Sequence, residues 1–237
     1  LVEKHVNINR LLELTKPVAT AVVPISAGRH IYKREPSFPI AVACDPAFNF
    51  VYEANIRYLH HLGEVTYFSP LADTSLPDAG FVYLPGGYPE LYLAALSANR
   101  QMLQSIRRYV ESGGKLLAEC GGMMYLCDEI RDKNGDVYPM AGVLHQSATM
   151  ENMKLRLGYR TLLYNETRLK GHEFHYSRLV EQQNPLPSCA VAYTAKGVET
   201  DTPLYHYKNV WAGYTHLYWA DPVGNEWFTK FVIDGNT

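Results

Sequence analysis

A cysteine followed by two glycines stands at the end of an apolar run in residues 115–126, Lys-Leu-Leu-Ala-Glu-Cys-Gly-Gly-Met-Met-Tyr-Leu. This order indicates a strand, a sharp turn at Cys120 and then a helix. Such a turn exposes the sulfur at the carboxyl edge of a sheet, and the start of a helix favours the thiolate, which is the nucleophilic form. A small buried cysteine in an ordinary strand-to-helix turn has the same local sequence. These residues alone therefore allow either nucleophilic catalysis or packing.

Two glycine loops offer backbone amides for a developing negative charge. Gly121 follows Cys120, and Gly86 and Gly87 belong to Leu-Pro-Gly-Gly-Tyr-Pro-Glu at residues 84–90, after another apolar run. In a parallel sheet both loops open at the carboxyl edge, where ligands bind. One amide from each loop would make an oxyanion hole, and loss of one such donor lowers a rate by on the order of a hundredfold or more. A plain Pro-Gly-Gly turn is the alternative interpretation.

Two downstream segments concentrate titratable side chains. His216 ends the strand-like stretch 211–216, Trp-Ala-Gly-Tyr-Thr-His, where an imidazole can take the proton of a thiol and later protonate a leaving group. In residues 171–177, Gly-His-Glu-Phe-His-Tyr-Ser, strand alternation places Glu173 on the face opposite to His172. We expect one of these faces to line a site. A structural histidine and a solvated edge strand are the alternatives.

The elements that position these residues alternate between short apolar runs and helical patterns. Strands are expected at 40–43, 65–68, 81–84 and 115–118, and helices at 50–62 and 97–112. Helices that alternate with buried strands imply a mostly parallel α/β sheet with helices on both faces. Later strand-like segments, without long helices between them, are expected as antiparallel additions at 140–144, 155–163, 173–176, 190–194 and 210–214. A last helix is expected near residues 225–233.

Composition excludes several classes of function. The 237 residues are 47% apolar, and 22 Lys and Arg stand against 24 Asp and Glu, with no basic stripe for nucleic acid. No apolar run approaches the ~20 residues that cross a bilayer, and no signal peptide is recognisable, so we expect a cytoplasmic protein without membrane contact. The four cysteines are expected as reduced thiols, and their spacing to the histidines matches no zinc site, so no metal is expected.

The four segments 84–90, 118–123, 171–177 and 213–216 together resemble, in order and spacing, the glutaminase domain of cobyrinic acid a,c-diamide synthases. The resemblance runs from about residue 38 to the end. It implies a class I glutamine amidotransferase-like, flavodoxin-like fold in which Cys120 forms a glutamyl thioester. His216 would be the base. The loops at Gly87 and Gly121 would hold the oxyanion, and glutamine would be the substrate.

The resemblance also implies how the chain is organised. Residues 1–36 would be the tail of a preceding synthetase domain with a linker, and 37–237 the glutamine amidotransferase domain. In the family the synthetase domain binds ATP and Mg²⁺ and activates carboxylates; its GxxxxGK[ST] pattern does not occur here, so no cofactor is expected in this chain. The chain would then be the glutaminase half of a carbon–nitrogen ligase, supplying ammonia for the a and c carboxylates of a tetrapyrrole, cobyrinic acid, in cobalamin biosynthesis.

One departure from the wider class I glutaminases concerns the base. They usually carry a carboxylate two residues after the histidine, and here that position is Tyr218. What orients His216 stays open, with Glu173 as a candidate substitute or glutamine-binding group. Related alternatives are the glutaminase halves that serve cobyric acid, hydrogenobyrinic acid or nickel-sirohydrochlorin, although Tyr-Pro-Glu after Gly87 resembles the a,c-diamide group better. A non-catalytic docking module and a cysteine peptidase of similar fold are the more distant alternatives.

Overall fold

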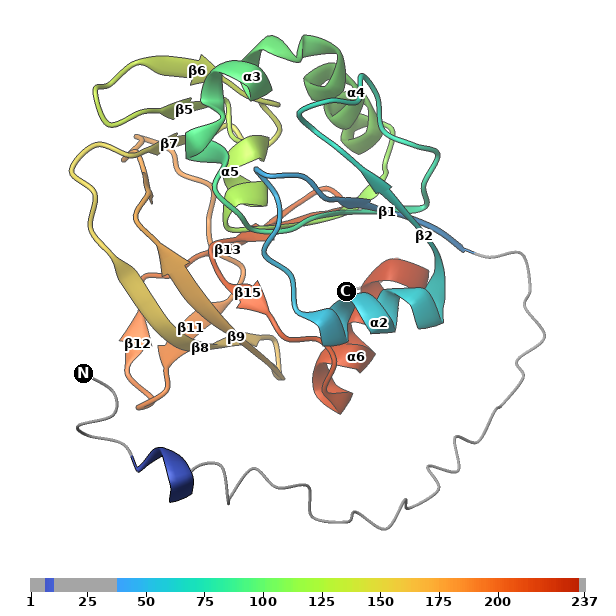
Figure 1. Ribbon diagram of the computed structural model, residues 1–237, viewed down its shortest axis with the longest axis vertical. Helices are drawn as coiled ribbons and strands as arrows, with labels where there is room; N and C mark the ends of the chain where they lie inside the picture. The colour runs from blue at the N-terminus through green and yellow to red at the C-terminus, as the bar shows by residue number, and fades with distance from the viewer. Residues whose placement is uncertain (1–6, 11–37, 235–237) are drawn as a thin grey trace. The chain divides into compact units, whose positions relative to one another are not determined.

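The computed structural model describes residues 7–10 and 38–234 (Figure 1). Contacts divide the chain into two units, residues 1–35 and 36–237. In the first unit only residues 7–10 are described, and 8–10 are helical. The tail and linker predicted over residues 1–36 therefore lie, apart from those four residues, outside the described part of the chain.

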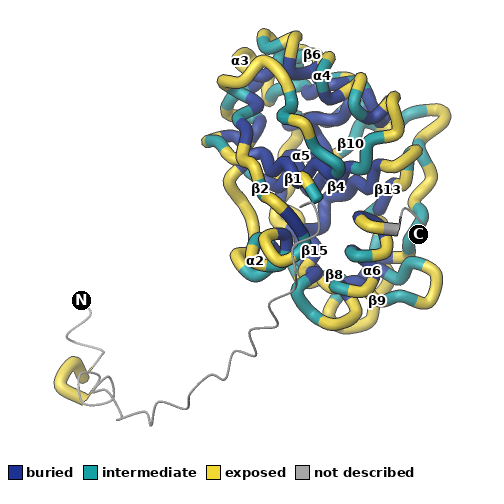
Figure 2. The backbone as a smooth tube through the Cα atoms, turned by 90° about the vertical axis from the view of Figure 1, so that its right-hand side faces the viewer, coloured by how far each residue is buried: buried dark blue, intermediate teal, exposed yellow. Residues whose placement is uncertain are grey.

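A six-stranded sheet forms the centre of the second unit (Figure 1). Its strands lie in the order β13 (Leu204–Tyr207), β14 (Val210–Gly213), β4 (Lys115–Glu119), β3 (Phe81–Leu84), β1 (Phe38–Ala43) and β2 (Gly63–Phe68). Every neighbouring pair is parallel except β13 with β14. All four residues of β3 and of β14 are buried, as expected for strands that are covered on both faces. Figure 2 shows buried backbone, in dark blue, around β1 and β4 at the centre of the unit.

Helices cover both faces of this sheet, which confirms the predicted α/β fold. One face carries α3 (Leu93–Ala98), α4 (Arg100–Glu111) and α5 (Gly121–Leu126), and the other carries α2 (Glu53–Leu62), α6 (Pro222–Thr229) and η3 (Lys230–Asp234). Strand alternation divides the core accordingly. Val82 and Leu84 belong to the apolar cluster of α4, and Phe81 and Tyr83 to that of α2 and α6.

Two smaller sheets flank the centre. One contains β12 (Glu199–Thr200), β11 (Val191–Thr194), β8 (Arg156–Tyr164), β9 (Thr167–His175) and β15 (His216–Leu217), all antiparallel. The other contains β10 (Arg178–Leu179), β7 (Ser147–Thr149), β5 (Glu129–Arg131) and β6 (Val137–Pro139). Of the antiparallel strands predicted for the C-terminal half, those at 155–163, 173–176 and 190–194 lie in the five-stranded sheet, in β8, β9 and β11, while β13, which was not predicted, joins the central sheet. The predicted strand at 210–214 is there as β14, and it lies parallel to β4.

The strand predicted at residues 140–144 is wrong. The amides of Ala141 and Val143 donate to the carbonyls of Tyr125 and Leu126 at the end of α5, at 3.0 and 2.8 Å. Because the last carbonyls of a helix have no partner inside it, this apolar segment is buried as their cap.

The helix predicted over residues 97–112 is two helices, α3 and α4, separated by Asn99. The Asn99 side chain accepts a hydrogen bond from the amide of Met102 at 3.3 Å, which is the contact of a residue that begins a helix. The predicted last helix begins earlier than expected, as α6, and continues into η3.

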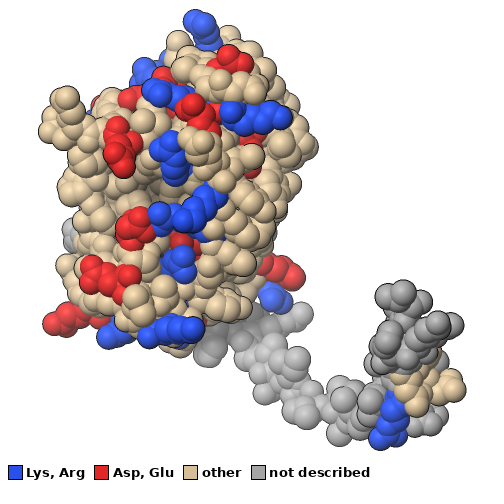
Figure 3. All heavy atoms as spheres, turned by 90° about the vertical axis from the view of Figure 1, so that its left-hand side faces the viewer, with Lys and Arg blue, Asp and Glu red and all other residues tan. Residues whose placement is uncertain are grey.

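The surface carries charges of both signs. On the face in Figure 3, Lys and Arg side chains are mixed with Asp and Glu. Among residues 7–10 and 38–234 there is no helix of the length and apolarity that a bilayer crossing requires. The same residues contain no cluster of three His, Cys, Asp or Glu side chains that would bind a metal ion.

Candidate active site

Cys120 lies at the turn between β4 and α5. Its φ of 49° is one that non-glycine residues rarely adopt, and such strain costs on the order of 1–3 kcal/mol. Its amide donates to the carbonyl of Gly213 at 2.7 Å, and its carbonyl accepts from the amide of Met124 at 3.0 Å. The side chain is 5% exposed, and its sulfur lies 4.0 Å from the carbonyl oxygen of Phe174 in β9. The turn therefore holds the sulfur toward the five-stranded sheet.

The two predicted glycine loops meet beside Cys120. β3 and β4 are adjacent and parallel, so the loops that follow them open at one edge. A Cβ on Gly121 would lie 3.3 Å from the amide nitrogen of Gly87, and one on Gly87 would lie 2.1 Å from the carbonyl oxygen of Ala47. The backbones approach so closely that a side chain does not fit at Gly87. The amides of both loops are therefore neighbours, as an oxyanion hole requires.

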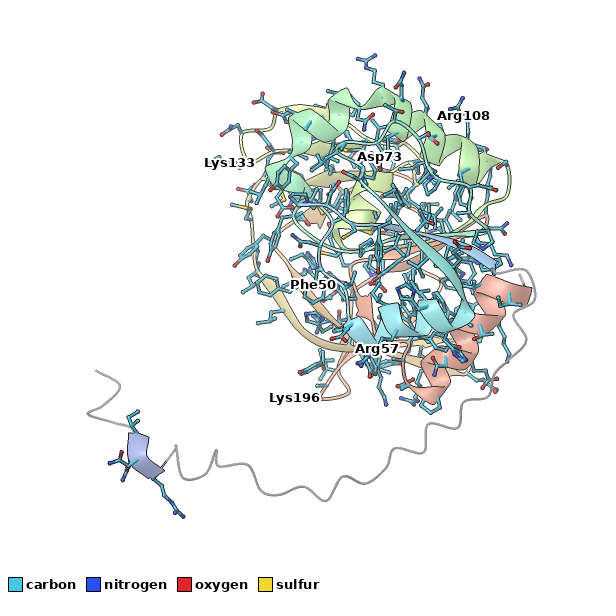
Figure 4. The ribbon with its side chains drawn as sticks, turned by 45° about the vertical axis from the view of Figure 1, so that its right-hand side comes forward. Phe50, Arg57, Asp73, Arg108, Lys133 and Lys196 are labelled. Carbon is cyan, nitrogen blue, oxygen red and sulfur yellow. The ribbon has the colours of Figure 1, made fainter. Side chains whose placement is uncertain are left out.

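The segment before α2 closes over the glycine loop. The amide of Phe50 donates to the carbonyl of Gly86, and the amide of Tyr88 donates to the carbonyl of Ala47, both at 3.0 Å. The helix predicted from residue 50 therefore begins only at Glu53, because the backbone of Phe50 is paired with the loop. In Figure 4, Phe50 lies between the green helices α3 and α4 and the cyan helix α2.

His216 lies in β15, opposite His172 of β9, and is 3% exposed. The centre of its ring is 4.4 Å from that of Phe50 and 5.1 Å from that of His172. A Cβ on Gly86 would lie 2.2 Å from its Cε1, so the imidazole packs directly on this glycine. Nδ1 of His216 is buried, and the described residues give it no hydrogen-bond partner. Packing therefore holds the ring.

One cavity of about 260 Å³ is lined by both Cys120 and the His216 imidazole. Its walls are Phe50, Gly87, Tyr88, Cys120, His172, Phe174 and His216. Cavities of this size suit a small, mostly enclosed ligand. His172 is itself fixed by a hydrogen bond of 2.7 Å between its Nδ1 and the Tyr52 hydroxyl. The His172 face of β9 therefore lines the site.

Glu173 lies on the opposite face of β9, as alternation predicts. Its Oε2 is 2.6 Å from Nη2 of Arg160, and its Oε1 is 3.9 Å from Nε2 of His175. It lines a second hollow, of about 330 Å³, with residues such as Arg156 and Asp201. Within residues 38–234 no hydrogen bond joins its carboxylate to Cys120 or His216. We therefore assign it no part in orienting the base.

Burial sets the protonation of Cys120 and His216. It raises the pKa of the Cys120 thiol to about 12, with the Glu90 carboxylate adding to the effect and the Gly121 amide opposing it. It lowers the pKa of His216 to about 3, with His172 and His175 acting in the same direction. Both groups are therefore neutral at neutral pH. The thiolate expected from the helix start is therefore not favoured, because burial outweighs the effect of the six-residue helix α5.

All four cysteines are free thiols, as predicted. Cys44 is exposed, Cys189 partly buried, and Cys120 and Cys127 buried. Only Cys120 lines the cavity with the imidazole. Sequence reasoning missed Phe50, Tyr52 and Glu119. Of these, only Glu119 gave a signal, as a carboxylate inside an apolar strand.

Comparison with protein families gives one match over most of this unit. Residues 39–223 match the CobB/CobQ-like glutamine amidotransferase domain. Among similar curated proteins, hydrogenobyrinate a,c-diamide synthase of Pseudomonas aeruginosa and cobyrinate a,c-diamide synthase of Fusobacterium nucleatum are each 40% identical over 76% of this chain and 41% of their own length. Cobyrinate a,c-diamide synthase of Clostridium acetobutylicum is 35% identical over 98% of the chain and 52% of its own length. The chain thus spans about half the length of these relatives.

Solved structures show the fold. PurLQS from Thermotoga maritima aligns with a TM-score of 0.53 and 16% identity, over 84% of this chain and 96% of that one. A glutamine amidotransferase aligns with a TM-score of 0.52 and 17% identity, over 81% of this chain and 98% of that one. At these identities the likeness supports the architecture alone, and it confirms the predicted class I glutamine amidotransferase-like fold.

Proposed function

Because the chain belongs to the CobB/CobQ-like glutamine amidotransferase family, we propose that it hydrolyses glutamine through a thioester on Cys120. The observation that carries the proposal is one cavity lined by a cysteine at a strained turn, an imidazole and the Gly87 loop, with the Gly121 loop directly beside Gly87. These are the parts that acyl transfer to a thiol requires: a nucleophile, a base and donors for the oxyanion.

In the first half of the reaction, the thiol attacks the carboxamide carbon of glutamine. His216, whose imidazole is neutral, takes the proton from Cys120 as the C–S bond forms. The oxygen that becomes negative accepts hydrogen bonds from the amides of Gly87 and Gly121. The imidazolium then protonates the nitrogen, the C–N bond breaks, and ammonia leaves a glutamyl thioester.

In the second half, water replaces ammonia. His216 takes a proton from water as its oxygen attacks the thioester carbonyl, and the same amides hold the oxyanion. Collapse of this intermediate breaks the C–S bond and returns the proton to Cys120. Glutamate leaves, and the thiol and imidazole are again neutral.

In the proposed intact enzyme, the ammonia amidates the a and c carboxylates of cobyrinic acid or its metal-free form. The names and lengths of the relatives support this assignment, since the chain matches about half of each. We propose that residues 1–36 are the tail of the synthetase half and a linker, and that this half binds ATP and Mg²⁺. The free thiols support a reducing compartment, and we propose the cytoplasm.

Release of glutamate and ammonia from isotopically labelled glutamine tests the proposal. We expect equal amounts of both from the native chain and from Cys44→Ser, which removes an exposed thiol outside the cavity. Cys120→Ser should release neither. Release that persists in Cys120→Ser, or native release no higher than that of Cys120→Ser, would contradict the proposal.

A further inference from the structure

Glu119 is a buried carboxylate that the proposed mechanism does not use. It is 2% exposed, and no ion pair among residues 38–234 includes it. Its Oε2 accepts a hydrogen bond from the Tyr83 hydroxyl at 2.7 Å, and its Oε1 accepts one from the Leu217 amide at 3.0 Å. The indole Nε1 of Trp219 donates to the same Oε1 at 3.4 Å. A buried carboxylate without a cation is uncommon, and here hydrogen bonds alone satisfy it.

The location of these bonds connects the two reactive groups. Glu119 is the last residue of β4 and directly precedes Cys120, while Leu217 directly follows His216. One side chain therefore ties the backbone that carries the nucleophile to the backbone that carries the base. Among the side-chain hydrogen bonds of the described residues, no other joins a residue adjacent to Cys120 to a residue adjacent to His216.

A second buried side chain completes this attachment. Nδ2 of Asn55 donates to the carbonyl of Leu217 at 2.8 Å, and its Oδ1 accepts from the amide of Trp219 at 3.2 Å. The segment after the base is thus held on both sides, by Asn55 from α2 and by Glu119 from β4. A short strand of two residues, β15, makes few ladder bonds of its own. These side chains therefore add to the support that its pairing with β9 provides.

The imidazole needs such support because nothing bonds its inner nitrogen. Nδ1 of His216 is buried without a hydrogen-bond partner in the described part of the chain, and the residue two positions later is Tyr218. The ring is held by packing on Gly86, Phe50 and His172, so its position follows that of its backbone. Errors of about 1 Å in the placement of a reacting group lower rates by on the order of a hundredfold.

We propose that Glu119 is a positioning residue, which fixes His216 relative to Cys120 by accepting the Leu217 amide and the Trp219 indole. This inference rests on the proposed roles of Cys120 and His216. The role is geometric: it depends on the length of the side chain and on its acceptor oxygens. It requires neither the negative charge of the carboxylate nor a proton transfer.

Two conservative substitutions at Glu119 distinguish the effect of side-chain length from the effect of charge. Glu119→Gln keeps the length and one oxygen for Leu217 and Trp219, and its NH₂ donates to the Tyr83 oxygen. Glu119→Asp keeps the charge, but is one methylene too short to hold the same bonds. The measurement is the rate of covalent labelling by a diazo-ketone analogue of glutamine, followed by intact mass, with its maximal rate and half-saturating concentration determined separately.

We expect Glu119→Gln to label within about threefold of the native maximal rate, and Glu119→Asp to fall about tenfold or more with half-saturation changed by less than about threefold. Ile106→Val, a change in the core on α4, is the control for a modest loss of stability, and it should label at the native rate. A native rate in Glu119→Asp, or a larger loss in Glu119→Gln than in Glu119→Asp, would overturn the positioning role. Failure of the native chain to label would instead count against the proposed function.

Discussion

Gly86→Ala tests whether the imidazole is held where the structure places it. Gly86 is not among the residues with positive φ, so the backbone accepts alanine there without strain. The new Cβ would lie 2.2 Å from Cε1 and 2.9 Å from Nδ1 of His216. Carbon atoms in contact are ordinarily about 3.5–4.0 Å apart. The ring or the loop must therefore retreat by more than about 1 Å.

The size of the effect follows from that displacement. A reacting group misplaced by about 1 Å lowers a rate by on the order of a hundredfold, because attack and proton transfer need aligned partners. We expect the maximal rate at which the glutamine-like diazo-ketone labels Cys120 to fall about a hundredfold in Gly86→Ala. Far-ultraviolet circular dichroism should remain native, because the change is confined to one loop residue beside the imidazole.

The matched control is Gly114→Ala. Its Cβ would lie 2.4 Å from Cε1 of Tyr109, another aromatic ring, and Gly114 also lacks a positive φ. Tyr109 lies on α4 and does not line the cavity. Gly114→Ala should therefore lose stability but label at the native rate. If a folded Gly86→Ala also labels at the native rate, the reasoning that this glycine sets the position of His216 is refuted.

Three further outcomes are expected. Phe50→Ala should raise the pKa of His216 from about 3 toward its usual value, because burial is the largest cause of its depression; an NMR titration that shows no rise would contradict this. Burial raises the pKa of Glu119 to about 7, so its contribution to stability is complete below about pH 4.5 and is lost as pH rises to about 7, a loss on the order of 3 kcal/mol. Glu119→Gln should remove this loss, and the free energy of urea unfolding at pH 5 and pH 7.5 measures it. An equal fall in unfolding free energy between the two pH values in both proteins would be the contrary result. Gly87→Ala should unfold at lower temperature and lose labelling, because its Cβ would lie 2.1 Å from the carbonyl oxygen of Ala47; native melting and labelling would show that the loop adapts.

Much of the central sheet was predictable because its strands are short apolar runs that end in turn residues. Such runs indicate a buried segment, but a buried apolar segment need not be a strand. Residues 140–144 are apolar because they cap α5, a role that depends on the carbonyls of Tyr125 and Leu126. The break between α3 and α4 lies at Asn99, whose side chain caps the start of α4, and the apolar spacing of the helix does not show it.

The candidate site was likewise predictable only in part. The positions of Cys120 and the glycine loops were predictable, because a strand-to-helix turn and close backbone approach require particular residue types in a local order. Glu119 was not, because its partners Tyr83 and Leu217 are 36 and 98 residues away along the chain. Phe50 likewise acquires its place from a backbone bond to the glycine loop. Contacts between distant segments decide these positions, and a local pattern does not encode them.

The most direct test of the central claim is mass analysis after treatment with the diazo-ketone analogue of glutamine. The native chain, Cys120→Ser and Cys44→Ser are compared, and peptide mapping locates the adduct. We predict one adduct, on Cys120, that is absent only in Cys120→Ser. No adduct on Cys120 in the folded native chain, or an adduct that persists in Cys120→Ser, would contradict the claim that Cys120 is a nucleophile that recognises glutamine.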